Sequence, residues 1–228
     1  MTAAPQPLRI ALDFVNAWLF DLDGSFILVD SGLSMHRERL DAALRAAGCE
    51  PGRLALHILT HPDSDHAGNS AWLREAWGAK VAIHEKDAPA LASGIMPRRR
   101  AIGSLSWIVG LSQLVPRKPG LGCTADILLE DGQSLEAWGL DAKVYHLPGH
   151  TPGSIGILTA PGDKVAGDFI AGDLVANWHR PGPGLLASDL EAYRASLDRA
   201  RALVPADGWV YPGHGAPFPA SGLAGIKL

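Results

Sequence analysis

Four side chains that can bind a metal lie within six residues of this chain, in the stretch THPDSDH at residues 60–66. The stretch directly follows an apolar run at residues 54–59, which predicts a short buried strand. Carboxylates and imidazoles packed this closely are unfavourable unless a cation or another charge partner neutralises the carboxylates. A divalent metal does so, and we therefore predict a fold built around a metal site at the end of this strand.

The spacing inside the stretch suits two adjacent metals. His61 and Asp63 alternate, so in an extended segment their side chains point the same way, whereas Asp65 and His66 begin a helix and face a neighbouring point. The alternative is a polar helix N-terminus in which Asp65 is the cap and the histidines are exposed.

Three further residues are candidate ligands. His150 and His214 each follow a short apolar strand and a Pro-Gly pair, so each imidazole is expected in a tight turn just past a strand end. The third candidate is an aspartate, and the pair Gly-Asp occurs three times in this part of the chain. We favour Asp173 over Asp168 because the apolar run at residues 169–171 places Asp173 at the end of a strand.

These segments, taken in order, resemble the metallo-β-lactamase superfamily, and the resemblance covers nearly the whole chain. It implies an α+β fold, the αββα sandwich, in which two mixed β-sheets are flanked by helices and the site lies at one edge between them. We take residues 1–228 as a single domain of this kind. The resemblance implies two metal positions, which are described by their ligands: the first is held by His61, Asp63 and His150, the second by Asp65, His66 and His214, and Asp173 bridges them.

One position departs from the commonest pattern of the family, which has histidine where this chain has Asp63. A carboxylate adds negative charge and hard oxygen character, which favours iron or manganese more than an all-imidazole site does. Zinc also accepts aspartate, at about 2.0–2.2 Å. We therefore expect two divalent metal ions, with zinc as the first choice and iron or manganese as alternatives.

The resemblance implies a hydrolase in which a metal-bridging hydroxide attacks the carbonyl of a small ester, lactone or thioester, with Asp65 shuttling the proton. Lactonases of this kind place a tyrosine three residues after the bridging aspartate, whereas this chain has Ala176. Two alternatives remain open. One is a diiron redox protein similar to the flavodiiron core, which has glutamate at the position of Asp63, and the other is a metal-binding module without catalysis.

The surroundings of the site are less constrained by the sequence. Trp178 and His179, just beyond Asp173, are candidates for the wall of the substrate pocket. Asp30 supports the site or is a simple turn aspartate. Residues 95–122 interrupt the alternation of strands and helices and carry a helix-like apolar run. We expect this insertion to form a lid over the pocket or an interface with a second copy of the chain, which would make a homodimer.

Charge and hydropathy limit the class of partner. The net charge of −4 offers no general attraction for a polyanion, and the one dense basic run, Arg98 to Arg100, is expected in a solvated loop. The longest uncharged run is shorter than the roughly 20 apolar residues that a bilayer span needs, and no N-terminal signal pattern is present. We expect a cytoplasmic protein that acts on a small molecule and binds neither nucleic acid nor membrane.

The remaining pattern predicts the element order. A hairpin is expected from residues 11–20 and 25–29, followed by a helix at 34–47, a helix from His66 to Gly78 and a strand at 80–84. The second half is expected to be mostly extended, with strands at 134–138, 143–147, 154–158 and 164–171. A last helix should begin at Ser188 in a capping box with Glu191 and run to about 204, before a closing strand at 209–211.

Overall fold

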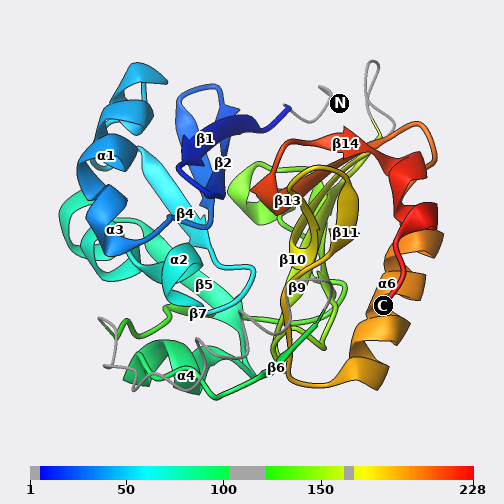
Figure 1. Ribbon diagram of the computed structural model, residues 1–228. Coiled ribbons are helices and arrows are strands. Elements are labelled where there is room, and N and C mark those ends of the chain that lie inside the picture. The colour runs from blue at the N-terminus through cyan, green and yellow to red at the C-terminus, as the bar shows by residue number, and fades with distance from the viewer. Residues whose placement is uncertain (1–5, 103–121, 162–166) are drawn as a thin grey trace.

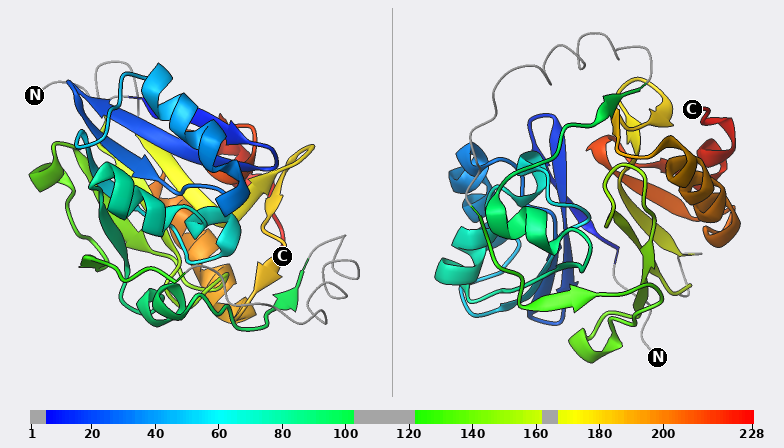
Figure 2. Two further views of the ribbon diagram at one scale, coloured as in Figure 1. Left: turned by 90° about the vertical axis from the view of Figure 1, so that its left-hand side faces the viewer. Right: turned by 90° about the horizontal axis from the view of Figure 1, so that it is seen from below.

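The computed structural model describes residues 6–102, 122–161 and 167–228. Two β-sheets face each other and helices cover their outer faces, as Figures 1 and 2 show from three directions. This is the predicted αββα sandwich. The first sheet is mixed, with its first three strands antiparallel and the others parallel. Its strands, in spatial order, are β1 (Leu8–Leu12), β2 (Val15–Leu22), β3 (Ser25–Val29), β4 (Leu54–Ile58), β5 (Lys80–His84) and β7 (Ile127–Leu129).

The second sheet is built by the second half of the chain. Its central pair, β10 and β13, is parallel, and the other pairs are antiparallel. In spatial order its strands are β14 (Phe218–Pro219), β13 (Trp209–Gly215), β10 (Asp168–Asn177), β9 (Ile155–Thr159) and β8 (Ala142–His146), with β11 (Pro181–Pro183) also on β10. A separate short pair joins β6 (Arg100–Ala101) to β12 (Leu186–Ala187).

The helices lie on both outer faces of the sandwich. In Figure 1, α1 (Arg37–Ala46) and α3 (Ser70–Trp77) flank the first sheet, and α6 (Leu190–Leu203) flanks the second. Two shorter helices, α2 (Ser64–Ala67) and α4 (Ala88–Ser93), follow β4 and β5, and three 3-10 turns complete the elements: η1 (Ser34–His36), η2 (Glu136–Trp138) and η3 (Ala220–Gly225). Among the described helices, none has both the length and the apolar character that crossing a bilayer requires.

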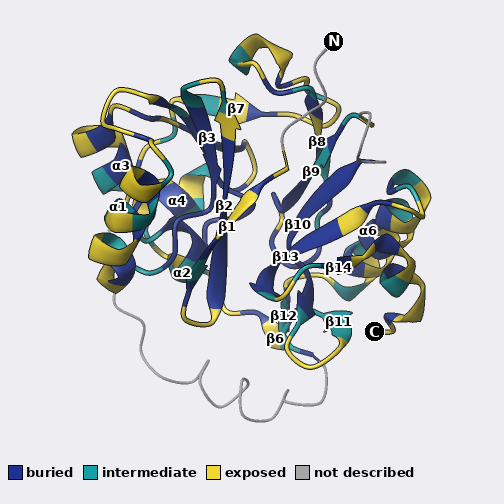
Figure 3. Ribbon diagram, turned by 90° about the horizontal axis from the view of Figure 1, so that it is seen from above, coloured by how far each residue is buried: buried dark blue, intermediate teal, exposed yellow. Residues whose placement is uncertain are grey.

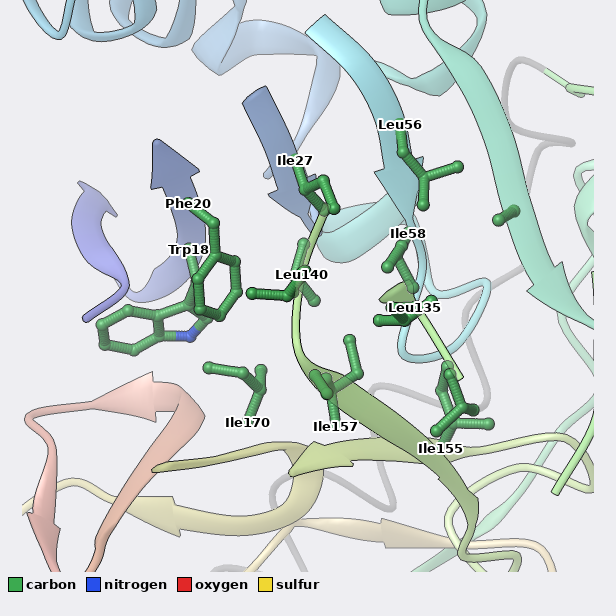
Figure 4. Packing of buried hydrophobic residues seen from close by; sticks show 14 of the residues in the cluster. Trp18, Phe20, Ile27, Leu56, Ile58, Leu135, Leu140, Ile155, Ile157 and Ile170 are labelled. Carbon is green, nitrogen blue, oxygen red and sulfur yellow. The ribbon is translucent and has the colours of Figure 1, made fainter. Parts of the chain in front are cut away.

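Alternating side chains on each strand build separate core layers. On β2, Trp18 and Phe20 face the second sheet, whereas Ala17 and Leu19 pack toward α1 and α3. Figure 4 shows the layer between the sheets, where Trp18 and Phe20 lie opposite Ile170. Each fully buried apolar side chain contributes about 1.5–3 kcal/mol. Figure 3 shows that burial is concentrated in the facing strands, which therefore form a stiff support for the loops at their ends.

The structure corrects several predicted boundaries. The run at residues 11–20 is two strands, because a turn at Asp13, which has φ 57°, divides β1 from β2. Residues 134–138 form mainly the turn η2 instead of a strand, because Gly139 adopts a positive φ of 85° and reverses the chain. The last helix is capped by Asp189, one residue after the predicted Ser188, and its carboxylate accepts hydrogen bonds from the two amides that follow the first helical residue.

Two predictions fall partly outside the described residues. The strand expected at 164–171 overlaps residues 162–166, and the structure describes it from Asp168 onward as β10. The insertion expected at 95–122 contains residues 103–121, so its role as a lid or an interface stays a prediction.

Candidate metal centre

All seven predicted ligands meet at one end of the sandwich. His61 and Asp63 lie in the loop after β4, and Asp65 and His66 lie on α2. His150 comes from the turn after β8, while β10 and β13 supply the other two ligands from the second sheet. Ligand atoms approach within 4.8 Å of one another in three groups: His61, Asp63 and His150; Asp65, His66 and His214; and His61, His66 and Asp173.

The first triad, His61, Asp63 and His150, is joined through one carboxylate oxygen. Asp63 Oδ2 lies 3.2 Å from His150 Nε2 and 3.5 Å from His61 Nε2. All three side chains are buried. The arrangement presents two imidazole nitrogens and a carboxylate to a common point.

The second triad, Asp65, His66 and His214, faces Asp173. Asp65 Oδ2 lies 3.6 Å from His214 Nε2 and 3.9 Å from His66 Nε2. Asp173 Oδ1 lies 3.3 Å from each of these two imidazole nitrogens, and its Oδ2 lies 3.7 Å from His150 Nε2 of the first triad. Asp173 therefore lies between the two triads, where a bridging carboxylate would be placed.

Asp168 occupies the opposite end of β10. It pairs in register with Trp209, whereas Ala176, near Asp173, pairs with His214. Close packing at the site end depends on glycine: a Cβ on Gly172, whose φ is 51°, would meet Thr60 Cβ at 2.7 Å. The structure thus brings Asp173, and not Asp168, to the histidines.

Hydrogen bonds on the far side of each ring orient the histidines. His66 Nδ1 donates to Asp30 Oδ2 at 2.8 Å, His150 Nδ1 to the carbonyl oxygen of Leu186 at 2.8 Å, and His214 Nδ1 to that of Phe14 at 2.7 Å. His61 Nδ1 lies 3.0 Å from Thr60 Oγ1. These contacts leave every Nε2 facing the centre, which is the arrangement found around metal-bound histidines.

The contacts of Asp30 decide between the two interpretations left open by the sequence, support of the site and a simple turn aspartate. Asp30 supports the centre. It is fully buried and accepts hydrogen bonds from the Thr60 amide at 2.9 Å and the Thr60 hydroxyl at 2.8 Å as well as from His66. Burial by itself would raise the pKa of Asp30, but the charge and hydrogen bond of His66 outweigh it and lower that pKa. Asp30 is therefore ionised and holds both the loop and the ring of His66.

The donor set fits a divalent cation. Within the described part of the chain, four buried atoms of the centre have no hydrogen-bond partner: His61 Nε2, Asp63 Oδ1, His66 Nε2 and Asp173 Oδ1. Leaving one such atom unsatisfied costs about 1–3 kcal/mol, and a cation at their common point removes that cost. Nitrogen and carboxylate donors in this ratio suit zinc, iron or manganese.

The carboxylates of the centre are in the form that binds metals. Burial would raise the pKa of Asp173, but the charges of His214 and His66 lower it well below its usual range. Burial would likewise raise the pKa of Asp63, but the charge of Arg99 together with the hydrogen bonds of His150 and His61 lowers that pKa well below its usual range. Burial lowers the pKa of His61, which favours its neutral, metal-binding form.

Arg99 is a residue beside the centre that the sequence did not reveal. The expected solvated loop is wrong at this position, because Arg99 is buried beside the first triad. Its Nη1 donates to His150 Nε2 at 2.9 Å, and its Nη2 donates to Asp63 Oδ2. A run of three arginines has the same pattern whether it is solvated or buried, so only the path of the chain could place Arg99 here.

The sequence pattern described as the metallo-beta-lactamase superfamily matches residues 10–214 of this chain. The chain belongs to the metallo-β-lactamase superfamily. Members of this superfamily bind divalent metals. The family match, together with relatives named as a metallo-hydrolase and a thioesterase, shows that the chain is a hydrolytic enzyme. The prediction of the family and of its fold is thereby confirmed.

Individual metallo-β-lactamase relatives match most of the chain. The probable metallo-hydrolase YflN of Bacillus subtilis is 28% identical over 226 residues, covering 92% of this chain and 83% of that protein. The acyl-coenzyme A thioesterase MBLAC2 of Gallus gallus is 28% identical over 226 residues, covering 91% of this chain and 75% of that protein. A metallo-β-lactamase structure from Cronobacter sakazakii superposes with a TM-score of 0.71 at 21% identity, covering 94% and 77% of the two chains, which shows a shared fold.

In this metallo-β-lactamase member, a cavity of about 460 Å³ opens beside the first triad. Its wall includes Asp63 and Arg99 of the centre, the exposed side chain of Lys86, and mainly apolar residues that include Ile95 and Met96. The cavity therefore joins a largely apolar space to the charged centre.

The two residues predicted to line the substrate pocket lie outside this cavity. Trp178 stacks on the ring of His214, with ring centres 5.0 Å apart, so it borders the second triad. His179 is exposed, and neither residue is among the described residues that line the cavity. Phe14, which the sequence did not single out, also stacks on His214 at 5.8 Å. The position of Trp178 leaves it a candidate for substrate contact at the rim, on the side of the second triad.

Proposed function

We propose that this chain is a metal-dependent hydrolase of a small ester, lactone or thioester. The observation that carries the proposal is the mainly apolar cavity that begins at Asp63 of the metal centre. An acyl chain placed in this cavity buries apolar surface, and its carbonyl carbon can then lie beside Asp63 of the first triad. Apolar pockets with a few polar groups at one end are typical of sites for small organic substrates.

The bound metals would supply an activated water and polarise the substrate carbonyl. The protein positions the substrate and moves protons. Asp65 has the most exposed side chain of the seven predicted ligands, at 23%, so its carboxylate can exchange a proton with solvent. Its Oδ2 also faces His214, so Asp65 is the residue we assign to proton transfer to the leaving group.

The charges around the cavity favour an acyl substrate with an anionic portion. Lys86 is exposed at the cavity wall, whereas the charge of Arg99 deeper inside is paired with Asp63. One relative is named an acyl-coenzyme A thioesterase, which supports a thioester as the first substrate class to test. The net charge of −4 supports a small molecule rather than nucleic acid as the partner.

We propose two divalent ions as cofactors, with zinc first and iron or manganese as alternatives because of the Asp63 carboxylate. Metal analysis of protein purified without added metal tests this choice. Zinc or manganese is the expected result for a hydrolase. Two irons with visible absorption that changes on reduction would instead favour the redox alternative similar to the flavodiiron core.

The substrate class is tested with an ester, a lactone and a thioester that carry the same acyl chain. Protein stripped with a chelator and reloaded with zinc, manganese or iron should hydrolyse at least one of them, and the chelator should abolish the turnover. Asp65→Asn should lower kcat more than it changes KM if Asp65 transfers the proton. A fully loaded, folded protein that hydrolyses none of the three would contradict the proposal and leave a metal-binding module without catalysis.

A further inference from the structure

Arg99 differs from both of its arginine neighbours. Arg98 and Arg100 are exposed, whereas only 4% of the side chain of Arg99 is accessible. Its guanidinium donates to both Asp63 Oδ2 and His150 Nε2. A buried arginine is costly unless its charge is paired and its donors are used, so this placement is a specific feature of the site.

The two acceptors of Arg99 are donor atoms of the first triad. With His61, they form the group of atoms that could hold a metal at the first position. A metal at that position needs the lone pair of His150 Nε2, which the guanidinium now occupies, and shares the charge of Asp63 with the guanidinium. His61 Nε2 and Asp63 Oδ1, which Arg99 does not contact, are the atoms of this triad without a hydrogen-bond partner in the described structure.

Within the described residues, no arginine or lysine is ion-paired with the second triad. In the described part of the chain, the ion pairs of Asp65 join it to His66 and His214. Asp173 also faces these two histidines. Asp173 faces both triads, so the two positions differ in their own carboxylates: Asp65 of the second triad pairs with histidines, whereas Asp63 of the first triad is paired with Arg99.

A metal can take the lone pair of His150 Nε2 only if the guanidinium of Arg99 moves away from it. Arg99 lies on residues 95–99, which have no regular secondary structure, between α4 and β6. Its side chain also lines the cavity, so open space lies directly beside the guanidinium.

We propose that Arg99 competes with metal at the first position, so that the second position fills first and the first position binds a divalent ion only when the guanidinium withdraws. The apparent affinity of a site falls by the fraction of protein that is competent to bind. If the Arg99-paired form makes up about 99% of the metal-free protein, the first position binds metal about 100-fold more weakly than it would without Arg99. The proposal concerns metal loading and does not depend on which substrate is hydrolysed.

The test is a zinc titration of metal-free protein, followed by competition with a chromophoric chelator. The wild type should show a tight step and a weak step. Arg99→Gln should strengthen the weak step by about 100-fold and leave the tight step unchanged. Arg98→Gln and Arg100→Gln, which remove the same charge from exposed neighbours, should titrate like the wild type.

The position that fills first is identified separately. Anomalous scattering from crystals grown with one equivalent of zinc should place the ion between Asp65, His66 and His214 in the wild type. An ion between His61, Asp63 and His150 under these conditions would overturn the proposal. The proposal would also be overturned if Arg99→Gln left both zinc steps unchanged or altered both equally.

The tight step serves as an internal control for folding. A variant that misfolds loses both steps, so an intact tight step shows that the centre of Arg99→Gln is assembled. Arg99→Lys provides a second comparison, because it keeps the charge but loses the planar fork that reaches two acceptors. Its weak step should lie between those of the wild type and Arg99→Gln, and a weak step as strong as that of Arg99→Gln would contradict competition by charge.

Discussion

The two halves of the centre are supported in different ways. The second triad is braced by the sandwich itself: His66 is fully buried on Asp30, and the ring of His214 is hydrogen-bonded to Phe14 and stacked on Phe14 and Trp178. The first triad is held by loops, opens onto the cavity and contacts Arg99. The second triad is thus preorganised, whereas the first triad includes Arg99, a positive charge that a bound metal would displace.

The difference follows from the elements that carry each half. Asp30 follows the central strand β3 and accepts a hydrogen bond from His66 directly, so the second triad is tied to the core, whereas Asp30 reaches His61 of the first triad only through Thr60. His150 lies on a turn that is held from outside, where the Ser188 amide donates to the Gly149 carbonyl at 2.7 Å and the Ser196 hydroxyl to that of Pro148 at 2.6 Å. A site needs rigid ligands for affinity and an open side for substrate. The second triad meets the first requirement, and the first triad, which opens onto the cavity, meets the second.

The largest effect is expected where the two halves meet. Asp173→Asn removes the charge of the one carboxylate that faces both triads, so both zinc steps should weaken. Residues that only orient ligands are worth about 10- to 100-fold in affinity or activity, and a shared ligand should exceed about 100-fold. Zinc titration and turnover measure the loss. Asp168→Asn, at the other end of β10, is the matched control, and an effect on one step alone would contradict the shared position.

Asp30→Asn should act on the second half more than on the first. The amide keeps the shape of the side chain but loses the charge that His66 pairs with, so the tight zinc step should weaken by about 10- to 100-fold. The weak step should change little. Asp23→Asn, an exposed aspartate with a similarly positive φ, should have no effect on zinc binding. An equal loss in both steps would show that Asp30 supports the centre as a whole.

Gly213→Ala tests how tightly the second half is packed. A Cβ at this position would lie 2.4 Å from Asp173 Oδ1 and 2.7 Å from His66 Cε1. Overpacking of this kind costs about 1–3 kcal/mol, so the tight zinc step should weaken by about tenfold. Gly225→Ala meets nothing within 4 Å and should leave both the thermal unfolding temperature and zinc binding unchanged. Unchanged zinc binding in Gly213→Ala would mean that the second half is more adaptable than its packing indicates.

The smallest effect is expected at the rim. Trp178→Ala removes one of the rings stacked on His214, and such a contact is worth about 0.5–1.5 kcal/mol. We expect a rise of about threefold in KM with little change in either zinc step. Trp209→Ala, a similarly exposed tryptophan at the start of β13, is the control. A large loss of the tight step in Trp178→Ala would place this ring among the supports of the second half.

Local patterns predicted the elements whose signals lie within a few neighbouring residues. The apolar runs of β4 and β5 and the glycine that ends α3 are of this kind. The turn at Asp13 was not predicted because apolar residues continue on both sides of it and the strand pattern shows no break. The cap of α6 was shifted by one residue because Ser188 and Asp189 are both good capping residues, and in the fold the carboxylate of Asp189 accepts the hydrogen bonds of the first amides.

The seven candidate ligands were recognised from sequence because each combines a metal-binding side chain with a local position at the end of an apolar strand. Their backbone supports are different. The carbonyl groups of Phe14 and Leu186 hold two of the histidines, yet every residue type has a carbonyl group. Such partners are set by which segments pack together, and for this reason they carry no sequence signal.

The sequence by itself determined the family, the sandwich and the set of side chains that the two sheets bring to one edge. The tertiary structure decided that Arg99 reaches Asp63, that the cavity opens beside the first triad and that Trp178 lies against His214. The physical reason is the distance along the chain over which each kind of interaction acts. Ligand spacing and strand alternation act over a few residues, whereas the partner of a long charged side chain depends on chain segments that are distant in sequence and meet only in the packed fold.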